Sequence, residues 1–219
     1  QALAQVIADK PIVFASVTDP VAAGLVDSMD KPGGNVTGTS DQIPADEQIK
    51  VLREIDPSIE RLGIVYSSSE VNSEVQAKAA KEAAEAAGLS VQEATIINSS
   101  EVQQAAESLD VDAYWVGNDN TVVSALESLL QVAESKQRFV FSTDADSVKR
   151  GAGAAYATDY KAQGVQTAGT IARILEEKKP QETPVEIQTN LELTINPEAA
   201  KRMGVEFPTS VTERADRTV

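Results

Sequence analysis

Short apolar runs recur along the chain, and each ends in a cluster of small polar residues that opens the next helical stretch. These segments lie at 12–20, 62–70 and 113–120, with a weaker copy at 139–144. Each apolar run has the length of a buried strand, and each polar cluster contains residues that cap helix N-termini. The pattern predicts an α/β fold with parallel strands flanked by helices. Because the carboxyl ends of such strands share one edge of a sheet, where ligands bind, the clusters indicate a binding site.

The order of these segments predicts two lobes. Residues 41–154 contain a complete series of strands and helices and are expected to form the second lobe. Residues 1–40 and 155–205 are expected to form a discontinuous first lobe, because the pattern changes after the central block and the chain returns to a separate layer. Residues 206–219 are polar and are expected to form a loosely held tail.

The composition narrows the possible functions. The chain has 19 Lys and Arg against 34 Asp and Glu, a formal charge of −15. This charge argues against nucleic acid or an anionic membrane as a partner, since both require basic surfaces. Cysteine and histidine are absent, so disulfides and thiolate metal sites are impossible and the usual general base is missing. No apolar stretch approaches the roughly 20 residues of a membrane-spanning helix.

No catalytic motif in the sequence is complete. Ser67–Ser69 follow a predicted strand, as a nucleophile would, but no Gly-x-Ser-x-Gly surrounds them and no histidine could activate them. The pair Gly33-Gly34 is not followed by the Gly-Lys-Ser/Thr of a phosphate loop. The acidic residues are scattered rather than grouped in one loop, so they do not predict a cation site. We therefore expect no enzymatic activity, no cofactor and no metal.

Several segments resemble one family of transport proteins. Residues 11–26 read PIVFASVTDPVAAGLV, residues 32–38 read PGGNVTG, and NPEAA follows at 196–200. These motifs are similar to those of ABC transporter substrate-binding proteins, in the family that includes the tryptophan- and phenylalanine-binding lipoproteins. The resemblance implies a two-lobed type I periplasmic-binding-protein fold with an amino-acid ligand, aromatic such as tryptophan or phenylalanine, in the interlobe cleft. Closure by hinge bending is expected near Gly38–Asp41 and Gly153–Asp159.

The resemblance also implies partners and a location. The partner would be an ABC permease in the membrane, and the location would be extracytoplasmic, either periplasmic or lipid-anchored at the cell surface. Members of the family carry further strand–helix units before the position of Ile12, so the chain resembles an N-terminally truncated member with an incomplete first lobe. A partial sheet has an exposed edge, so self-association through this lobe is a further expectation.

An amino-acid ligand requires hydrogen-bond donors for its carboxylate and an acceptor for its ammonium group. Helix N-termini with nearby hydroxyl and amide groups supply the donors, which makes Ser16, Thr18, Ser68 and Asn72 candidates. Asp119, between a predicted strand and a predicted helix, is the candidate for the ammonium group. Each of the acidic candidates could instead only cap a helix. The candidate set is completed by Asn118, Asn120, Asp144 and Asp159.

Two alternatives remain open at this point. Tyr66, Trp115 and Tyr156 could form an apolar wall for an aromatic ligand, or they could pack in the core. The alternative function is the ligand-sensing domain of a regulator with the same fold. A helix-turn-helix encoded upstream would favour the regulator, and an export signal would favour the transporter.

Overall fold

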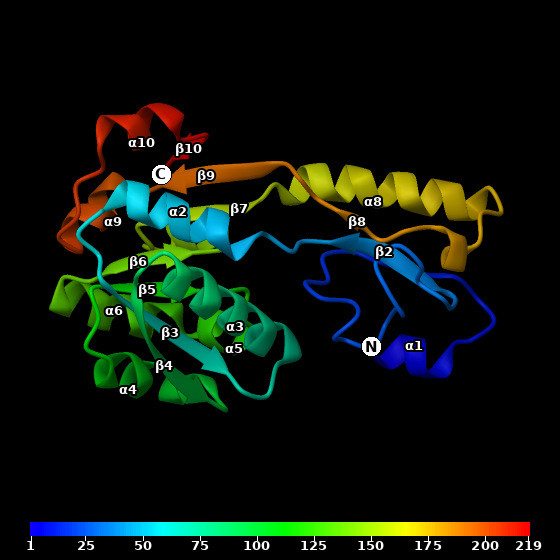
Figure 1. Ribbon diagram of the computed structural model, residues 1–219, viewed down its shortest axis with the longest axis horizontal. Helices are drawn as coiled ribbons and strands as arrows, with labels where there is room; N and C mark the ends of the chain where they lie inside the picture. The colour runs from blue at the N-terminus through cyan, green and yellow to red at the C-terminus, as the bar shows by residue number, and fades with distance from the viewer. The chain divides into compact units, whose positions relative to one another are not determined.

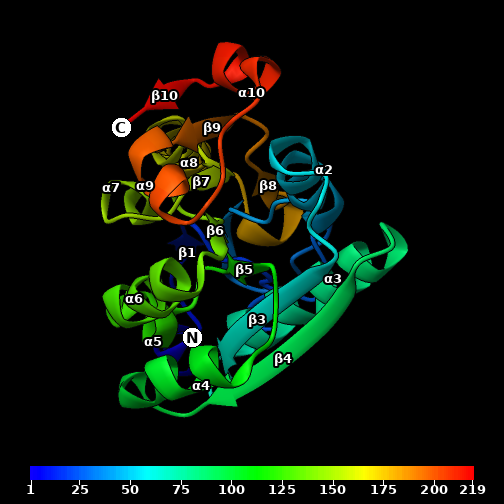
Figure 2. The same cartoon turned by 90° about the vertical axis from the view of Figure 1, so that its left-hand side faces the viewer.

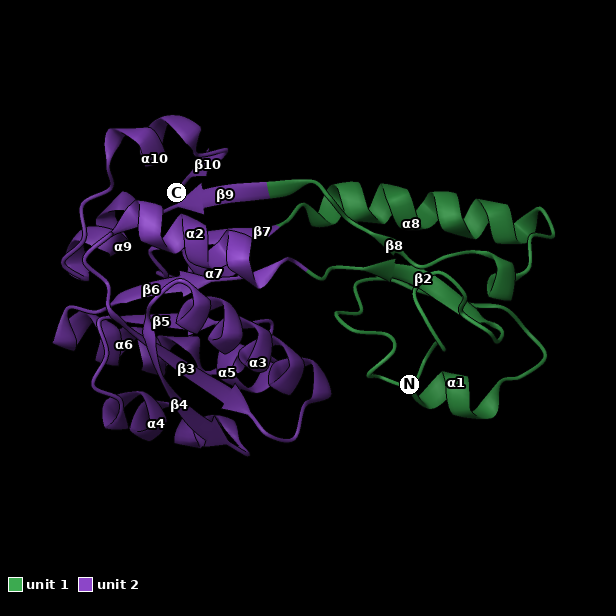
Figure 3. Ribbon diagram, viewed as in Figure 1, with its two compact units in different colours: residues 1–42, 158–191 green, residues 43–157, 192–219 purple.

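Helices and parallel strands alternate along most of the chain in the computed structural model, which describes all 219 residues (Figure 1). The chain divides into two units (Figure 3). Unit 1 contains residues 1–42 and 158–191, and unit 2 contains residues 43–157 and 192–219. The chain therefore passes between the units three times. The predicted α/β fold with parallel sheets flanked by helices is confirmed.

Unit 1 is built on a small parallel sheet. Its elements are α1 (Ala2–Val6), β1 (Ile12–Phe14), β2 (Val36–Ser40), α8 (Tyr160–Leu175), the 3-10 turn η2 (Pro180–Glu182) and β8 (Glu186–Ile187). The strand order is β1-β2-β8, so β1 is an edge strand and β2 is central. The whole of β2 is buried although it is rich in hydroxyl residues. These hydroxyls are satisfied: Thr37 Oγ1 donates to the Thr183 carbonyl at 2.7 Å, and Thr39 Oγ1 lies 2.7 Å from Thr167 Oγ1 of α8.

Gly38 is the point of closest approach between β1 and β2. In the parallel register Phe14 lies opposite Gly38. A Cβ atom at Gly38 would lie 2.1 Å from the Phe14 carbonyl oxygen and 2.6 Å from its ring. Only a residue without a side chain allows this spacing, so glycine at this position fixes the packing of the edge strand.

Unit 2 is built on a larger sheet. Its strands are β3 (Arg61–Ser67), β4 (Ser90–Ile96), β5 (Ala113–Val116), β6 (Phe139–Ser142), β7 (Ala154–Thr158), β9 (Leu191–Ile195) and β10 (Arg217–Thr218). Its helices are α2 (Ala45–Ile55), α3 (Val71–Ala86), the 3-10 turn η1 (Ser99–Glu101), α4 (Val102–Ser108), α5 (Asn120–Ser124), α6 (Leu126–Lys136), α7 (Ala145–Lys149), α9 (Pro197–Arg202) and α10 (Thr209–Arg214). The sheet order is β10-β9-β7-β6-β5-β3-β4, and the pairs from β4 to β7 are parallel.

Both faces of the unit 2 sheet are buried, which explains its continuous apolar strands. In β3, Ile64 packs with the small alanines of α3, whereas its neighbour Val65 packs on the other face with α4. Likewise, Tyr114 and Trp115 of β5 point to opposite faces. Figure 2 shows α3 and α4 on the two sides of β3 and β4. The strands predicted from the four apolar runs correspond to β1, β3, β5 and β6.

The end of the chain differs from the expected division. Residues 192–205 were expected in the first lobe, and residues 206–219 were expected to form a polar tail, but both segments belong to unit 2. Leu193 and Ile195 of β9 are buried in its core, and β10 pairs in parallel with β9. Val211 of α10 is buried in the same core, and Phe207 and Ala215, four residues before and after it, pack against that core. Three apolar residues at this spacing were the signal for docking, and the polar composition of the rest of the segment obscured it.

Candidate functional site

Polar residues gather in unit 2 where β3, β5 and β6 end. Asn118, two residues after the end of β5, is the centre of this cluster. Its carbonyl accepts from Asn72 Nδ2 at 2.8 Å, and its side-chain Oδ1 accepts from Thr143 Oγ1 at 2.8 Å. Its backbone N–H donates to Gln76 Oε1 at 3.0 Å. The structure thus brings together Asn72 and Asn118, two residues that the sequence proposed for the site.

Asp119 lies beside this cluster and is 2% exposed. Its Oδ1 accepts from the backbone N–H of Val122 at 2.8 Å, which caps α5. Its Oδ2 accepts from the backbone N–H of Ser67 at 2.6 Å, at the end of β3. Each carboxylate oxygen therefore holds a backbone group of unit 2. This geometry supports the capping role that the sequence left open, and ligand contact by Asp119 stays a prediction.

Glu70 connects the start of α3 to the start of α5. Its carboxylate accepts four hydrogen bonds, two from Asn120 and two from Thr121, at 2.6 to 3.3 Å. Burial raises the pKa of Glu70, but these hydrogen bonds outweigh it and hold the pKa below its usual value. The candidate Asn120 is exposed, and its side-chain amide is already hydrogen-bonded to Glu70. The candidate Ser68 is also exposed.

Asp144 caps α7 and therefore has a local structural role. Its Oδ2 accepts from the backbone N–H and the hydroxyl of Ser147, both at 2.9 Å, and its Oδ1 accepts from Asp146 N at 3.2 Å. Asp159 has the same role at α8, where Oδ1 accepts from the N–H groups of Lys161 and Ala162. Both acids satisfy donors that would otherwise lack partners in a first helical turn.

The candidates of unit 1 lead to a residue that the sequence did not single out. Thr18 Oγ1 donates to Asp41 Oδ1 at 3.1 Å, and the Tyr160 hydroxyl donates to Asp41 Oδ2 at 3.2 Å. Asp41 directly follows β2 and is 6% exposed. Burial raises the pKa of its carboxyl above the usual value, against the lowering effect of the two hydroxyls. Because β2 is itself hydroxyl-rich, the acid that ends it did not match the apolar-run pattern.

A buried amide, the side chain of Gln163, lies three residues after Tyr160 in α8. Ser16, which has a left-handed backbone with φ of 56°, donates from Oγ to Gln163 Oε1 at 2.5 Å. Gln163 is 1% exposed, and its Nε2 has no hydrogen-bond partner. An unsatisfied buried donor of this kind is unusual in folded proteins and costs free energy. Unit 1 therefore holds both an acidic acceptor and a spare donor at the start of α8.

The three aromatic candidates all pack in unit 2. Trp115 is buried in the sheet core, and Tyr66 and Tyr156 are partly buried against the same core cluster. Burial raises the pKa of both tyrosines. All three aromatic side chains therefore pack in or against the core, as one of the two alternatives expected. Their contact with an aromatic ligand stays a prediction.

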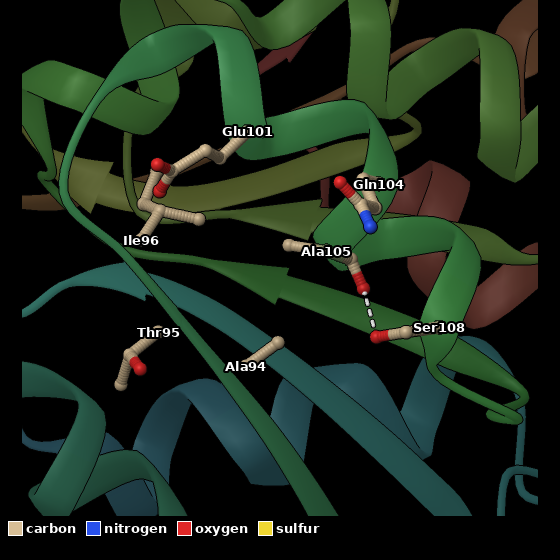
Figure 4. A pocket seen from close by; sticks show the side chains of 7 residues that line it. All are labelled: Ala94, Thr95, Ile96, Glu101, Gln104, Ala105 and Ser108. Carbon is tan, nitrogen blue, oxygen red and sulfur yellow. Dashed lines mark hydrogen bonds between the residues drawn. The ribbon is translucent and has the colours of Figure 1, made fainter.

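Two hollows lie away from these polar groups. The hollow of about 390 Å³ lies between β4 and α4 (Figure 4). Two of its polar side chains are already bonded: Ser108 Oγ donates to the Ala105 carbonyl, and Glu101 accepts from Ile97 N and Asn98 Nδ2. A second hollow of about 360 Å³ lies in unit 1 beside the edge strand, and its apolar lining includes Ile12, Val13, Phe14, Leu25 and Val36.

The structure shows neither a metal cluster nor a membrane span. No group of three or more acidic residues is placed to hold a metal ion. None of the helices combines the length and the apolar character needed to cross a membrane.

Comparison with known proteins gives a consistent result across the whole chain. The family model described as ABC transporter substrate binding protein matches residues 1–219. The tyrosine-binding protein of Clostridioides difficile (strain R20291) is 35% identical over 200 residues, and the match covers 90% of this chain. This chain spans 58% of the length of that curated relative.

Solved structures agree with the sequence match. A conserved domain protein from Vibrio cholerae O1 biovar eltor is 37% identical with a TM-score of 0.94, covering 100% of this chain and 74% of the other. An ABC domain from Streptococcus pneumonia, in complex with L-Trp, is 34% identical with a TM-score of 0.93, covering 99% and 74%. A glucose-galactose binding protein and a LacI family regulator are only 14% and 12% identical, so they show the fold alone.

Proposed function

This chain belongs to the family of ABC transporter substrate-binding proteins, and from this membership we propose that it captures an aromatic amino acid for an ABC importer. It is a substrate-binding protein and not an enzyme. One observation carries the choice of ligand: over nearly the whole chain it is 34% identical to a domain that binds L-Trp. The tyrosine-binding relative supports the same ligand class. The regulator alternative is supported only by the shared fold.

The proposal includes a partner, a location and a movement. The partner is a permease of an ABC importer, and the chain acts outside the cytoplasm, in the periplasm or anchored by a lipid. Capture occurs by hinge bending at the passages between units, at 42–43, 157–158 and 191–192. The first two passages lie at or next to the hinge segments predicted from the sequence, whereas the third was not predicted. Short crossing segments of this kind suit hinge motion, since few backbone angles need to change.

Ligand specificity is tested by thermal unfolding of the chain with each of the twenty amino acids. We expect L-tryptophan, L-phenylalanine or L-tyrosine to raise the unfolding temperature, because a ligand that binds only the folded state stabilises it. At a concentration of 100 times Kd the gain is about 2.7 kcal/mol, and for a chain of this size this corresponds to roughly 5–11 °C. Glycine and the D-enantiomers serve as controls. No shift with any amino acid would contradict the proposed ligand class.

Self-association through the edge strand is the second proposal on partners. In the parallel pairing Ile12 N–H donates towards β2, to the Asn35 carbonyl, so the N–H and C=O of Val13 point to the open edge. An open edge beside an apolar hollow favours pairing with a second copy of the chain.

We expect a concentration-dependent dimer in sedimentation experiments, weakened by Val13→Pro. Proline at this position removes only the donor that faces the open edge, because the Val13 N–H does not bond β2. The matched control is Val21→Pro in the exposed turn outside the sheet, which should leave the dimer intact. A wild-type chain that remains monomeric at all concentrations refutes the proposal.

A further inference from the structure

We propose that Asp41 of unit 1, held between Thr18 and Tyr160, is the residue that binds the ammonium group of the ligand. This inference rests on the proposed function, since it assigns a role within amino-acid capture. It places the acceptor at the carboxyl end of β2, on a residue that the sequence patterns did not indicate.

The first support is the way in which three separate segments converge on one carboxylate. Thr18 comes from the loop after β1, Asp41 from the end of β2, and Tyr160 from the first turn of α8. Their hydroxyls contact different oxygens of Asp41, at 3.1 and 3.2 Å. Both of these hydroxyl groups are neutral donors that orient the carboxylate. Carboxyl ends of strands are also where α/β proteins bind ligands.

The second support is the cost of burying this carboxylate. Asp41 is 6% exposed, and burial outweighs its hydrogen bonds so that its pKa is raised. An ionised carboxylate in such a place is stabilised strongly by a cation that enters with its own donors. A primary ammonium group matches this requirement, because it carries one positive charge and three N–H donors.

The third support is the spare donor of Gln163. Tyr160 and Gln163 are three residues apart in α8 and therefore lie on the same helix face. Ser16, two residues before Thr18, fixes Gln163 Oε1, which leaves the buried Nε2 as an unpartnered donor. Unit 1 thus has a buried acid, held by Tyr160, and a buried spare donor one helical turn further along α8, which provides the polarity that the two charged groups of an amino acid need.

Asp119, the acid chosen from the sequence, fits this role less well. Each of its oxygens already accepts a backbone N–H at 2.6 or 2.8 Å, and these bonds hold β3 and α5 together. The hydroxyl partners of Asp41 are side chains that can reorient around a ligand. We therefore assign the ammonium group to Asp41 rather than to Asp119.

The test compares Asp41→Asn with wild type by calorimetric titration. Two probes are used: an L-aromatic amino acid and its deaminated analogue, the matching 3-arylpropionate. Because the variant removes the charge but keeps the size, we expect at least about 30-fold weaker binding of the amino acid. Binding of the analogue, which lacks the ammonium group, should change by less than about 3-fold. The control Asp19→Asn alters another acid of unit 1, which contacts only its own turn, and should leave both affinities unchanged.

Stability measurements separate ligand binding from a structural role. Because the pKa of Asp41 is raised in the folded state, its ionisation destabilises the fold as the pH rises through that pKa. Asp41→Asn should therefore unfold at the same or a higher temperature than wild type at pH 7, and this difference should shrink as the pH falls through the pKa of Asp41 and the carboxylate is protonated. A lower unfolding temperature together with equal loss of both probes would assign Asp41 a structural role and overturn the inference.

The remaining outcomes are also decisive. Amino-acid binding within about 3-fold of wild type in Asp41→Asn would overturn the role of Asp41 but leave the proposed function intact. If the wild-type chain binds neither probe and none of the twenty amino acids, the proposed function itself fails, and the assignment of Asp41 fails with it.

Discussion

Gly38→Ala is expected to destabilise unit 1 by about 3 kcal/mol, the upper part of the range for overpacked cores. The new Cβ would lie 2.1 Å from the Phe14 carbonyl oxygen, which is a backbone atom and cannot rotate away. Relief requires β1 to separate from β2, because Phe14 and Gly38 are opposite each other in the register. Hydrogen exchange should then show loss of protection in β1 and β2, while the amides of β3 and β5 in unit 2 stay protected.

Gly164→Ala is the matched control for this variant. Gly164 lies in α8 of the same unit, and no atom lies within 4 Å of a Cβ placed there. Alanine in an exposed helix interior is favoured over glycine by roughly 0.5–1 kcal/mol, so this control should be neutral or slightly stabilising. If Gly38→Ala unfolds at the wild-type temperature with β1 still protected, the close approach of the two strands is wrong.

The buried strands of unit 2 were predictable because burial on both faces requires a continuous apolar run in the sequence. A strand buried on both faces must be apolar along its length, and the runs at 62–66, 113–116 and 139–141 meet this requirement. The same reasoning placed polar groups at the ends of these strands, and Asn72 and Asn118 do meet there. Local pattern and tertiary position agree in these cases.

The role of each acid was less predictable than its position. Asp119, Asp144 and Asp159 all follow strands, and all three cap helices in the structure. Capping and ligand contact require the same residue types at the same place, so a sequence pattern does not separate them. Asp41 was missed for a different reason: its strand is buried but rich in Thr and Ser, and the hydroxyls of Thr37 and Thr39 are satisfied by residues more than 120 positions away.

The division of the chain into units was predictable only in part. The return of the chain to unit 2 after residue 191 depends on the pairing of β9 and β10 and on the burial of Val211. These are contacts between segments whose own composition is polar or mixed. Periodicity in the sequence predicts whether a segment forms a helix or a strand. It does not predict which distant segment that helix or strand will pair with.

Asp119→Ala is expected to destabilise unit 2 by about 3 kcal/mol, because two buried backbone N–H groups lose their acceptor at a cost of about 1–3 kcal/mol each. These are Ser67 N–H at the end of β3 and Val122 N–H in the first turn of α5. For a chain of this size the unfolding temperature should fall by roughly 6–12 °C. Thermal unfolding followed by circular dichroism measures this fall.

Asp144→Ala is the control, since Asp144 also caps a helix but lies at a more accessible position. Its loss should cost only about 1 kcal/mol, the usual value for an N-cap. The comparison also tests the choice between the two acids proposed for the ammonium group. If Asp119→Ala keeps the wild-type unfolding temperature but no longer binds an aromatic amino acid, Asp119 contacts the ligand and its structural role is wrong. If Asp119→Ala is less stable than wild type but its folded fraction binds the ligand as wild type does, Asp119 has a structural role. Its two hydrogen bonds to backbone N–H groups of β3 and α5 then explain why an acid occupies position 119.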